Sequence, residues 1–169
     1  SRKPERDLKL AALEADGVPV HRRRGGGGAV ILTAGQVVLA LVTEVASDFG
    51  NREYARAING WVVEALASLG VHGLEQRGIT DLALHDRKVL GTSIYRSRRV
   101  LFYQASLLVS NDVSVFSRYL EHPDAEPDYR QGRDHDAFCT TLRGEGYDLD
   151  PRRVIAALAP IAERRLADL

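Results

Sequence analysis

The chain of 169 residues has no methionine and a single cysteine, Cys139. One cysteine excludes an internal disulfide framework and is typical of a protein from a reducing cytoplasm. Long apolar runs are also absent, since the longest, residues 37–42, has only the length of a strand, whereas a membrane helix needs about 20 residues. Residues 1–7 carry no apolar segment of a signal peptide. From these absences we expect a cytoplasmic protein that does not enter a membrane.

Charge of either sign is not in excess, because 23 basic side chains balance 23 acidic ones. This balance argues against nucleic acid or a membrane surface as the partner. The 44% hydrophobic and 27% charged residues are ordinary for a globular protein, and the length suffices for one domain with a core. Because methionine is missing even at the start, we expect a trimmed form of a longer protein that lacks an N-terminal part of the fold.

Apolar periodicity predicts helices and strands that alternate along the chain. Helices are expected at residues 4–15, 51–69 and 113–120, and from Asp150-Pro151 toward Leu169 with a bend at Pro160. Strands are expected at residues 29–32, 36–42, 81–84, 87–96 and 99–109, and residues 122–138 form a structured loop. The last three strands read as an antiparallel meander. We therefore expect an α+β fold with a mostly antiparallel or mixed central sheet flanked by helices. It forms a single domain over residues 1–169, with 1–142 as its core and 143–169 as a C-terminal loop and helix.

Four glycines, residues 25–28, follow Arg22, Arg23 and Arg24 and lead into an apolar segment. Backbone N–H groups of glycines can crowd around an anion, and the guanidinium groups add fixed positive charge. No Gly-Lys-Ser/Thr follows, which excludes a P-loop, and a strand instead of a helix excludes a dinucleotide fingerprint. A phosphate cradle and a merely flexible loop fit this run about equally well.

Lys88 enters a predicted strand after a turn, where a lysine is usually a solvated edge residue. Its neighbourhood suggests more, because Asp81 precedes it and Gly91-Thr92-Ser93 follow. A lysine beside an acyl carbonyl and a phosphate would stabilise developing negative charge. Asp81 would position that ammonium or carry Mg²⁺ with a nucleotide, or would simply begin a strand.

Cys139 lies beside Phe138 and four residues after His135. A nucleophilic cysteine would need such a histidine, but packing is the commoner role and the one we favour. The five histidines show no zinc-ligand spacing. Residues 129–136 are dense in charge, which fits a solvated turn, a lid or a docking edge.

Several of these pieces recur together, in order, in one known family. The elements are Arg22-Arg23 with Gly26-Gly27-Gly28-Ala29-Val30, then Thr80-Asp81-Leu82, then Asp86-Arg87-Lys88-Val89-Leu90-Gly91-Thr92-Ser93, and finally Leu107-Leu108. In this pattern the chain resembles the lipoate–protein ligase family of the biotinyl/lipoyl ligase superfamily. The similarity runs from about Asp7 to the short helix after Asp112.

The resemblance implies a class II synthetase-like catalytic domain. It also implies a two-step reaction in which ATP, with Mg²⁺, activates lipoate or octanoate to an acyl-adenylate. The acyl group then passes to a lysine of a lipoyl domain, such as that of a 2-oxoacid dehydrogenase E2 or glycine cleavage H protein. Lys88 and Asp81 take the catalytic positions, with Asp81 as the one metal contact, through the nucleotide. Positions that bind the adenylate are Arg22, Arg23, Gly26, Gly27, Gly28, Ala29, Gly91, Ser93, Arg96 and Gln104.

The chain also departs from the family pattern. Leu32 and Gln104 stand where the family often has histidines, on the acyl side of the site, and the family's first strand is absent. A separate accessory subunit is a conceivable partner. An ATP-independent octanoyltransferase would need a cysteine in the loop before Lys88, but residues 75–78 contain none. A biotin ligase has a different glycine signature, and a non-catalytic module that binds lipoyl domains stays open.

Overall fold

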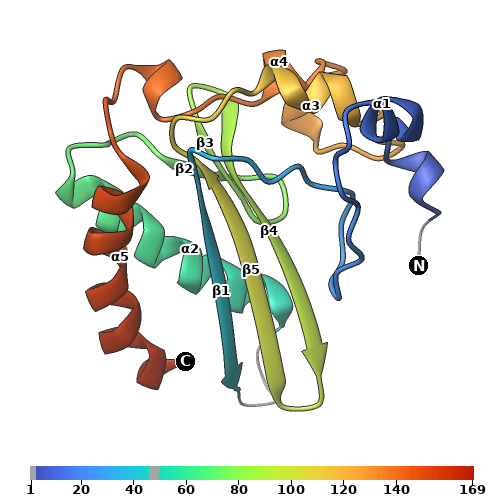
Figure 1. Ribbon diagram of the computed structural model, residues 1–169. Coiled ribbons are helices and arrows are strands. Elements are labelled where there is room, and N and C mark those ends of the chain that lie inside the picture. Colours follow the sequence, from blue (N-terminus) through green and yellow to red (C-terminus); the bar gives the residue numbers. More distant parts are fainter. Residues whose placement is uncertain (1–2, 46–49) are drawn as a thin grey trace.

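The computed structural model describes residues 3–45 and 50–169 (Figure 1). One antiparallel sheet of five strands has the order β1-β5-β4-β3-β2. The strands are β1 (Gln36–Glu44), β2 (Glu75–Arg77), β3 (Asp81–Leu84), β4 (Arg87–Ser97) and β5 (Val100–Leu108). The α-helices are α1 (Leu10–Ala15), α2 (Asn51–Ser68), α3 (Ser114–Tyr119), α4 (His135–Phe138) and α5 (Pro151–Arg165). Short 3₁₀ helices occupy Pro4–Arg6, Asp128–Arg130, Arg143–Glu145 and Leu166–Asp168. The expected α+β fold with a helix-flanked sheet is confirmed.

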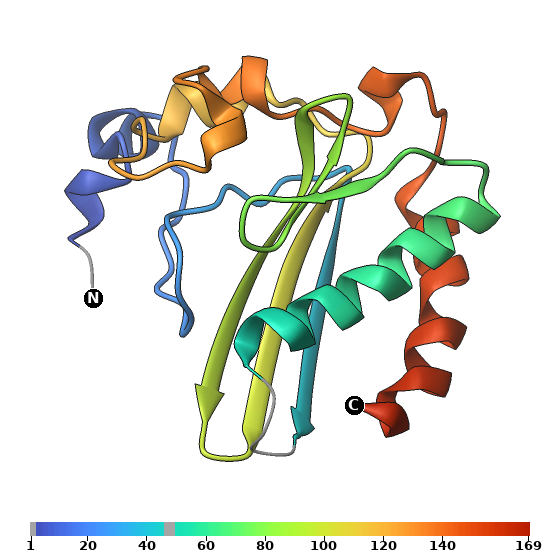
Figure 2. The same cartoon turned by 180° about the vertical axis from the view of Figure 1, so that it is seen from behind.

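Helices α2 and α5 pack on the same face of the sheet and on each other (Figure 2). Ile58, Val62 and Leu66 of α2 recur at helical spacing, and all are buried. Helix α5 adds Val154 and Leu158 to the same core. Burial of each such side chain contributes about 1.5–3 kcal/mol, so this face is the main source of stability.

Strand alternation leaves the opposite face of the sheet open. In β1, Val37 and Leu41 are buried against the helices, whereas Val38 and Val42 are 52% and 65% exposed. In β5, Tyr103 and Ala105 are buried in the same way, and Gln104 lies between them. The open face therefore has room for a ligand.

A tight hairpin joins β3 to β4. His85 and Asp86 form its two-residue turn, and both have positive φ angles, 46° and 66°. Such a turn matches the right-handed twist of paired strands. The register is irregular between Leu82 and Ala83 in β3. Asp81 and Lys88 lie on these adjacent strands, and Lys88 Nζ is 2.8 Å from Asp81 Oδ1.

The prediction of one continuous helix at residues 4–15 is wrong. The segment splits into the 3₁₀ helix Pro4–Arg6 and the helix α1. Between them Leu8 forms an isolated bridge with Leu120, and the amide of Lys9 donates to the carbonyl of Tyr119. Pairing with a segment distant in sequence thus interrupts a helical pattern.

The predicted strand at residues 29–32 is also wrong, because no neighbouring strand of the described chain pairs with it. Its side chains still alternate: Ala29 and Ile31 pack against a second apolar cluster, whereas Val30 and Leu32 are 52% and 57% exposed. Strand β2 escaped prediction because its three residues, Glu-Gln-Arg, carry no apolar pattern.

Candidate functional site

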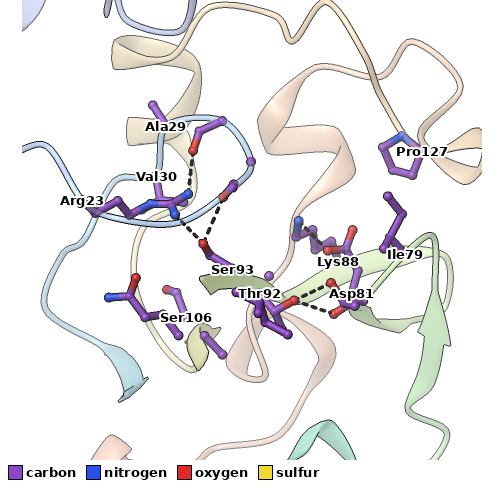
Figure 3. A pocket seen from close by; sticks show the side chains of 18 of the residues that line it. Arg23, Ala29, Val30, Ile79, Asp81, Lys88, Thr92, Ser93, Ser106 and Pro127 are labelled. Atoms are coloured by element: carbon purple, nitrogen blue, oxygen red, sulfur yellow. Dashed lines mark hydrogen bonds and ion pairs between the residues drawn. The ribbon is translucent and has the colours of Figure 1, made fainter. Parts of the chain in front are cut away.

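A cavity of about 720 Å³ opens between the glycine run, the open face of β4 and β5, and residues 125–128 (Figure 3). Most of the residues singled out in the sequence line it, namely Arg23, Gly26, Gly27, Gly28, Ala29, Asp81, Lys88, Gly91, Ser93 and Gln104. The glycine run and Lys88 therefore share one cavity although about sixty positions separate them.

The glycine loop is fastened to β4 by its own arginine. One terminal nitrogen of Arg23, Nη1, donates to Ser93 Oγ, and Nη2 donates to the carbonyl of Gly28 at 3.0 Å. Ser93 Oγ in turn donates to the carbonyl of Gly26 at 2.9 Å. Figure 3 shows these bonds around the loop. Burial lowers the pKa of the Arg23 guanidinium, which still remains cationic at neutral pH.

Gly25 has a backbone conformation that suits glycine alone, with a φ angle of 142°. A Cβ at this position would also collide with Ser93 Oγ and Arg23 Nη1. The loop therefore needs glycine where it crosses β4.

Lys88 and Asp81 form an ion pair at the cavity wall. Lys88 Nζ lies 2.8 Å from Asp81 Oδ1, and the two side chains are 28% and 14% exposed. The phenol of Tyr129 donates to the other oxygen, Asp81 Oδ2, at 3.0 Å. Burial and the nearby Asp81 carboxylate raise the pKa of Tyr129, so its hydroxyl keeps its proton and acts as the donor. The Lys88 ammonium therefore lies at the wall of the cavity, and Asp81 and Tyr129 hold it there.

A buried polar chain holds Thr80, the residue before Asp81. Tyr103 Oη donates to Asn59 Oδ1 at 2.6 Å, and Asn59 Nδ2 donates to the Thr80 carbonyl at 2.9 Å. Thr92 Oγ1 also contacts that carbonyl at 3.3 Å. Asn59 is fully buried, so this chain links the core of α2 to the edge of the cavity.

Arg22 and Arg96 are not among the residues that line the cavity within the described chain. Arg96 comes three positions after Ser93 in β4, so it projects from the opposite face of the strand. There its guanidinium carbon lies 5.6 Å from the ring centroid of Tyr54, on α2. Arg22 is exposed. The structure thus supports ten of the predicted positions as neighbours and separates these two from them.

Cys139 is buried beside the Lys88 strand. The amide of Thr140 donates to the carbonyl of Lys88, and Cys139 is 8% exposed. Burial raises the pKa of its thiol, and burial lowers the pKa of His135. His135 Nε2 contacts the carbonyl of Glu121 at 3.0 Å. Both observations support the packing interpretation, because a buried neutral thiol is a poor nucleophile.

A second cavity of about 240 Å³ adjoins the first and shares Lys88, Gly91 and Ser106 with it. Its walls include Phe116 of α3, Phe138 of α4 and Cys139, which directly follows α4.

Sequence reasoning missed Tyr129, Asn59 and the cavity wall at residues 125–128. Tyr129 is 48 positions from Asp81, and no local pattern relates the two. Only the high charge density of residues 129–136 marked that region as worth attention.

Across the described residues, no helix is long and apolar enough to cross a membrane. Within the same residues, no three His, Cys, Asp or Glu side chains gather as they would to hold a metal ion.

Comparison with known proteins agrees with the sequence resemblance. The lipoyl protein ligase A/B catalytic domain family matches residues 1–161. A Schizosaccharomyces pombe protein assigned as a lipoate-protein ligase A is 31% identical over 90 residues, covering 47% of this chain and 25% of that protein.

Two solved structures share the fold. A bi-partite lipoate protein ligase from Thermoplasma acidophilum, described with its E2 lipoyl domain, has a TM-score of 0.82 at 21% identity. That match covers 98% of this chain and 65% of the other. A lipoate-protein ligase A bound with ATP has a TM-score of 0.81 at 21% identity, covering 98% and 66%. The chain thus spans about two thirds of these structures and a quarter of the curated relative. The expected biotinyl/lipoyl ligase-like fold is confirmed.

Proposed function

Because this chain belongs to the lipoyl protein ligase A/B catalytic domain family, we propose that it activates lipoate or octanoate with ATP and transfers the acyl group to a lysine of a lipoyl domain. The observation that carries this proposal is the convergence of the glycine loop and Lys88 on one cavity. We take residues 1–169 as one catalytic domain, since Val154 and Leu158 of its C-terminal helix share the core with the sheet.

The cavity suits the anhydride of an adenylate. The amide of Gly26 already donates to the carbonyl of Ile94 at 3.4 Å, so the loop would offer the backbone N–H groups of Gly27 and Gly28. Arg23 and Lys88 offer positive charge. In the first step a carboxylate oxygen of the acid bonds to the α-phosphorus of ATP, and pyrophosphate leaves. Lys88 would stabilise the charge that develops on the carbonyl and phosphate oxygens. The ATP-bound relative supports a nucleotide in this fold.

The apolar part of the cavity suits the acyl chain. Val30, Leu32 and Val38 line it and are each more than half exposed. Gln104 lies on the same side, and its amide oxygen is buried without a hydrogen-bond partner in the described chain. An aliphatic tail would cover these exposed side chains, which stabilises the bound acid by removing apolar surface from water.

Magnesium fits this site chiefly as an ion carried by the nucleotide. Asp81 would be its contact from the protein, but Lys88 and Tyr129 already bind the two oxygens of that carboxylate. Mg²⁺ commonly takes one or two carboxylates and fills its remaining positions with phosphates and water. When bound, the ion would neutralise phosphate charge.

In the second step the neutral amine of the acceptor lysine attacks the acyl carbonyl. The amide bond forms, AMP leaves with the electrons of the broken bond, and the amine proton passes to solvent. The bi-partite relative, described with its E2 lipoyl domain, supports a lipoyl domain as the acceptor, and we propose that it is of the E2 or glycine cleavage H-protein type. It also supports a separate accessory subunit. The single buried cysteine is consistent with a cytoplasmic protein.

One experiment tests the reaction. The full-length protein is mixed with lipoate and a lipoyl domain, and the mass of the domain is followed with and without ATP. A gain of one lipoyl group that requires ATP supports the ligase. In a parallel reaction octanoyl carrier protein replaces lipoate and ATP, and a gain of acyl mass only there would instead establish an ATP-independent transferase.

A non-catalytic module is the second candidate. Leu32 and Gln104, where the family often has histidines, favour it, since both line the cavity. In that case the protein binds the lipoyl domain tightly and leaves its mass unchanged. The same mass measurement, combined with a binding titration, separates the two.

A further inference from the structure

Tyr129 is buried beside the proposed site, with 7% of its surface exposed, yet it lines neither described cavity. It comes from the 3₁₀ helix Asp128–Arg130, whose first residue also ends the cavity wall at residues 125–128. Its hydroxyl donates to Asp81 Oδ2 at 3.0 Å, whereas Lys88 Nζ lies 2.8 Å from the other carboxylate oxygen, Oδ1. Tyr129 therefore contacts the Lys88–Asp81 ion pair through Asp81.

The ring of Tyr129 contacts two further side chains, those of Phe138 and Arg77. Its centroid lies 5.0 Å from that of Phe138, and the guanidinium carbon of Arg77 lies 5.1 Å from it. Contacts of this kind restrain a ring beyond simple burial. The hydroxyl therefore presents a fixed donor to Asp81.

A fixed donor matters here because the Asp81 carboxylate and the Lys88 ammonium could each adopt several positions without it. The terminal torsion of an aspartate is broad, so a carboxylate held at one oxygen can turn. Lysine has a flexible four-carbon stem and a point charge that accepts many geometries. With Tyr129 on one oxygen of Asp81, the other oxygen has a set position for the Lys88 ammonium.

We propose that Tyr129 is a positioning residue that holds the Asp81 carboxylate so that Lys88 Nζ stays at the wall of the shared cavity. The inference rests on the proposed function, because its readout is adenylate formation. Tyr129 itself does not contact the reacting atoms.

The variant Tyr129→Phe removes only the hydroxyl oxygen and keeps the ring. We expect kcat for pyrophosphate release with ATP and lipoate to fall about tenfold, with KM for both substrates within about twofold of wild type. The thermal unfolding midpoint should stay close to wild type. A purely structural role would instead lower the midpoint without this selective loss of kcat.

Tyr119→Phe is the matched control. Tyr119 Oη donates to Asp16 Oδ2 at 2.8 Å, the same type of bond, on an exposed surface outside the cavities. This variant should leave kcat unchanged. An equal loss of kcat in both variants would overturn the inference.

A double-mutant cycle tests whether Tyr129 acts through Asp81. In the background of Asp81→Asn, adding Tyr129→Phe should lower kcat by less than twofold, because the group that it positions is already altered. If the fold-loss of kcat in the double variant equalled the product of the losses in the two single variants, the inference would be overturned. A wild-type protein that releases no pyrophosphate would overturn the proposed function and the inference together. An active wild type matched by Tyr129→Phe would overturn the inference alone.

Discussion

Because Gly91 has no Cβ, the end of the Lys88 side chain can lie against it. A Cβ at Gly91 would lie 2.8 Å from Lys88 Cε and 2.9 Å from Nζ, closer than real contacts allow. We expect Gly91→Ala to displace the ammonium from Asp81 and to lower pyrophosphate release about tenfold or more. Gly60→Ala is the control, because a Cβ there meets nothing within 4 Å. Wild-type rates in Gly91→Ala would contradict this role of glycine.

Lys88 itself should be indispensable to the first step. Lys88→Ala removes the positive charge at the cavity wall, so we expect adenylate formation to fall about 100-fold or more while the circular dichroism spectrum stays that of the wild type. The measurement is pyrophosphate release with lipoate and ATP. A variant that releases pyrophosphate at the wild-type rate would remove Lys88 from the mechanism.

At the residue scale, the sequence could predict groups that belong to compact motifs. The glycine run and Lys88 lie in such motifs, and the structure brings them together. Arg96 lies on the opposite face of β4 from Ser93, away from the other predicted site residues, as its odd spacing from Ser93 in a strand indicates. The role of Tyr129 could not be predicted from the sequence, because its hydrogen bond to Asp81 joins two residues that are 48 positions apart.

Among the elements, α5 shows how a local signal starts a helix. Asp150 Oδ1 accepts from the amide of Arg152 at 2.7 Å, with Pro151 at the first helical position. We expect Asp150→Ala to lower the free energy of unfolding by about 1 kcal/mol, measured by urea denaturation. Asp148→Ala should change it little, since that side chain is 94% exposed. Equal losses in the two variants would argue against the cap.

Elements with their own periodicity or turn chemistry were predictable, as α2 and the His85-Asp86 hairpin show. Residues 4–15 and 29–32 were not, because tertiary contacts decided their conformation. Leu8 pairs with Leu120 and breaks a helical pattern. Residues 29–32 alternate like a strand but lie over a cavity instead of beside a partner.

For the whole molecule, sequence patterns could not predict that β1 pairs with β5. Val37 of β1 faces Leu107 of β5, and no turn joins those strands. Such non-local pairing reflects the burial of one sheet face against α2 and α5, which depends on the complete chain. The cavity draws on the same assembly, since its walls come from segments between residues 23 and 128.

Glu145, at the end of the 3₁₀ helix Arg143–Glu145, contacts His85 and Arg87 at the β3–β4 turn. Although burial raises its pKa, hydrogen bonds from His85, Thr140 and Arg87 bring the pKa of Glu145 below its usual value. A lowered folded-state pKa stabilises the protein above the unfolded-state value, and this contribution disappears as pH falls through the folded-state value. We expect Glu145→Gln to destabilise the protein at pH 7, by urea denaturation, and to cost progressively less below about pH 4.5. A pH-independent cost would contradict this.

The bonds from Arg23 and Ser93 give the glycine loop its shape without any help from an anion. Fixing the backbone of one residue costs about 1–2 kcal/mol of conformational entropy. Because folding has already ordered this loop, a phosphate bound there, as we propose, would lose little of its binding free energy to ordering the chain.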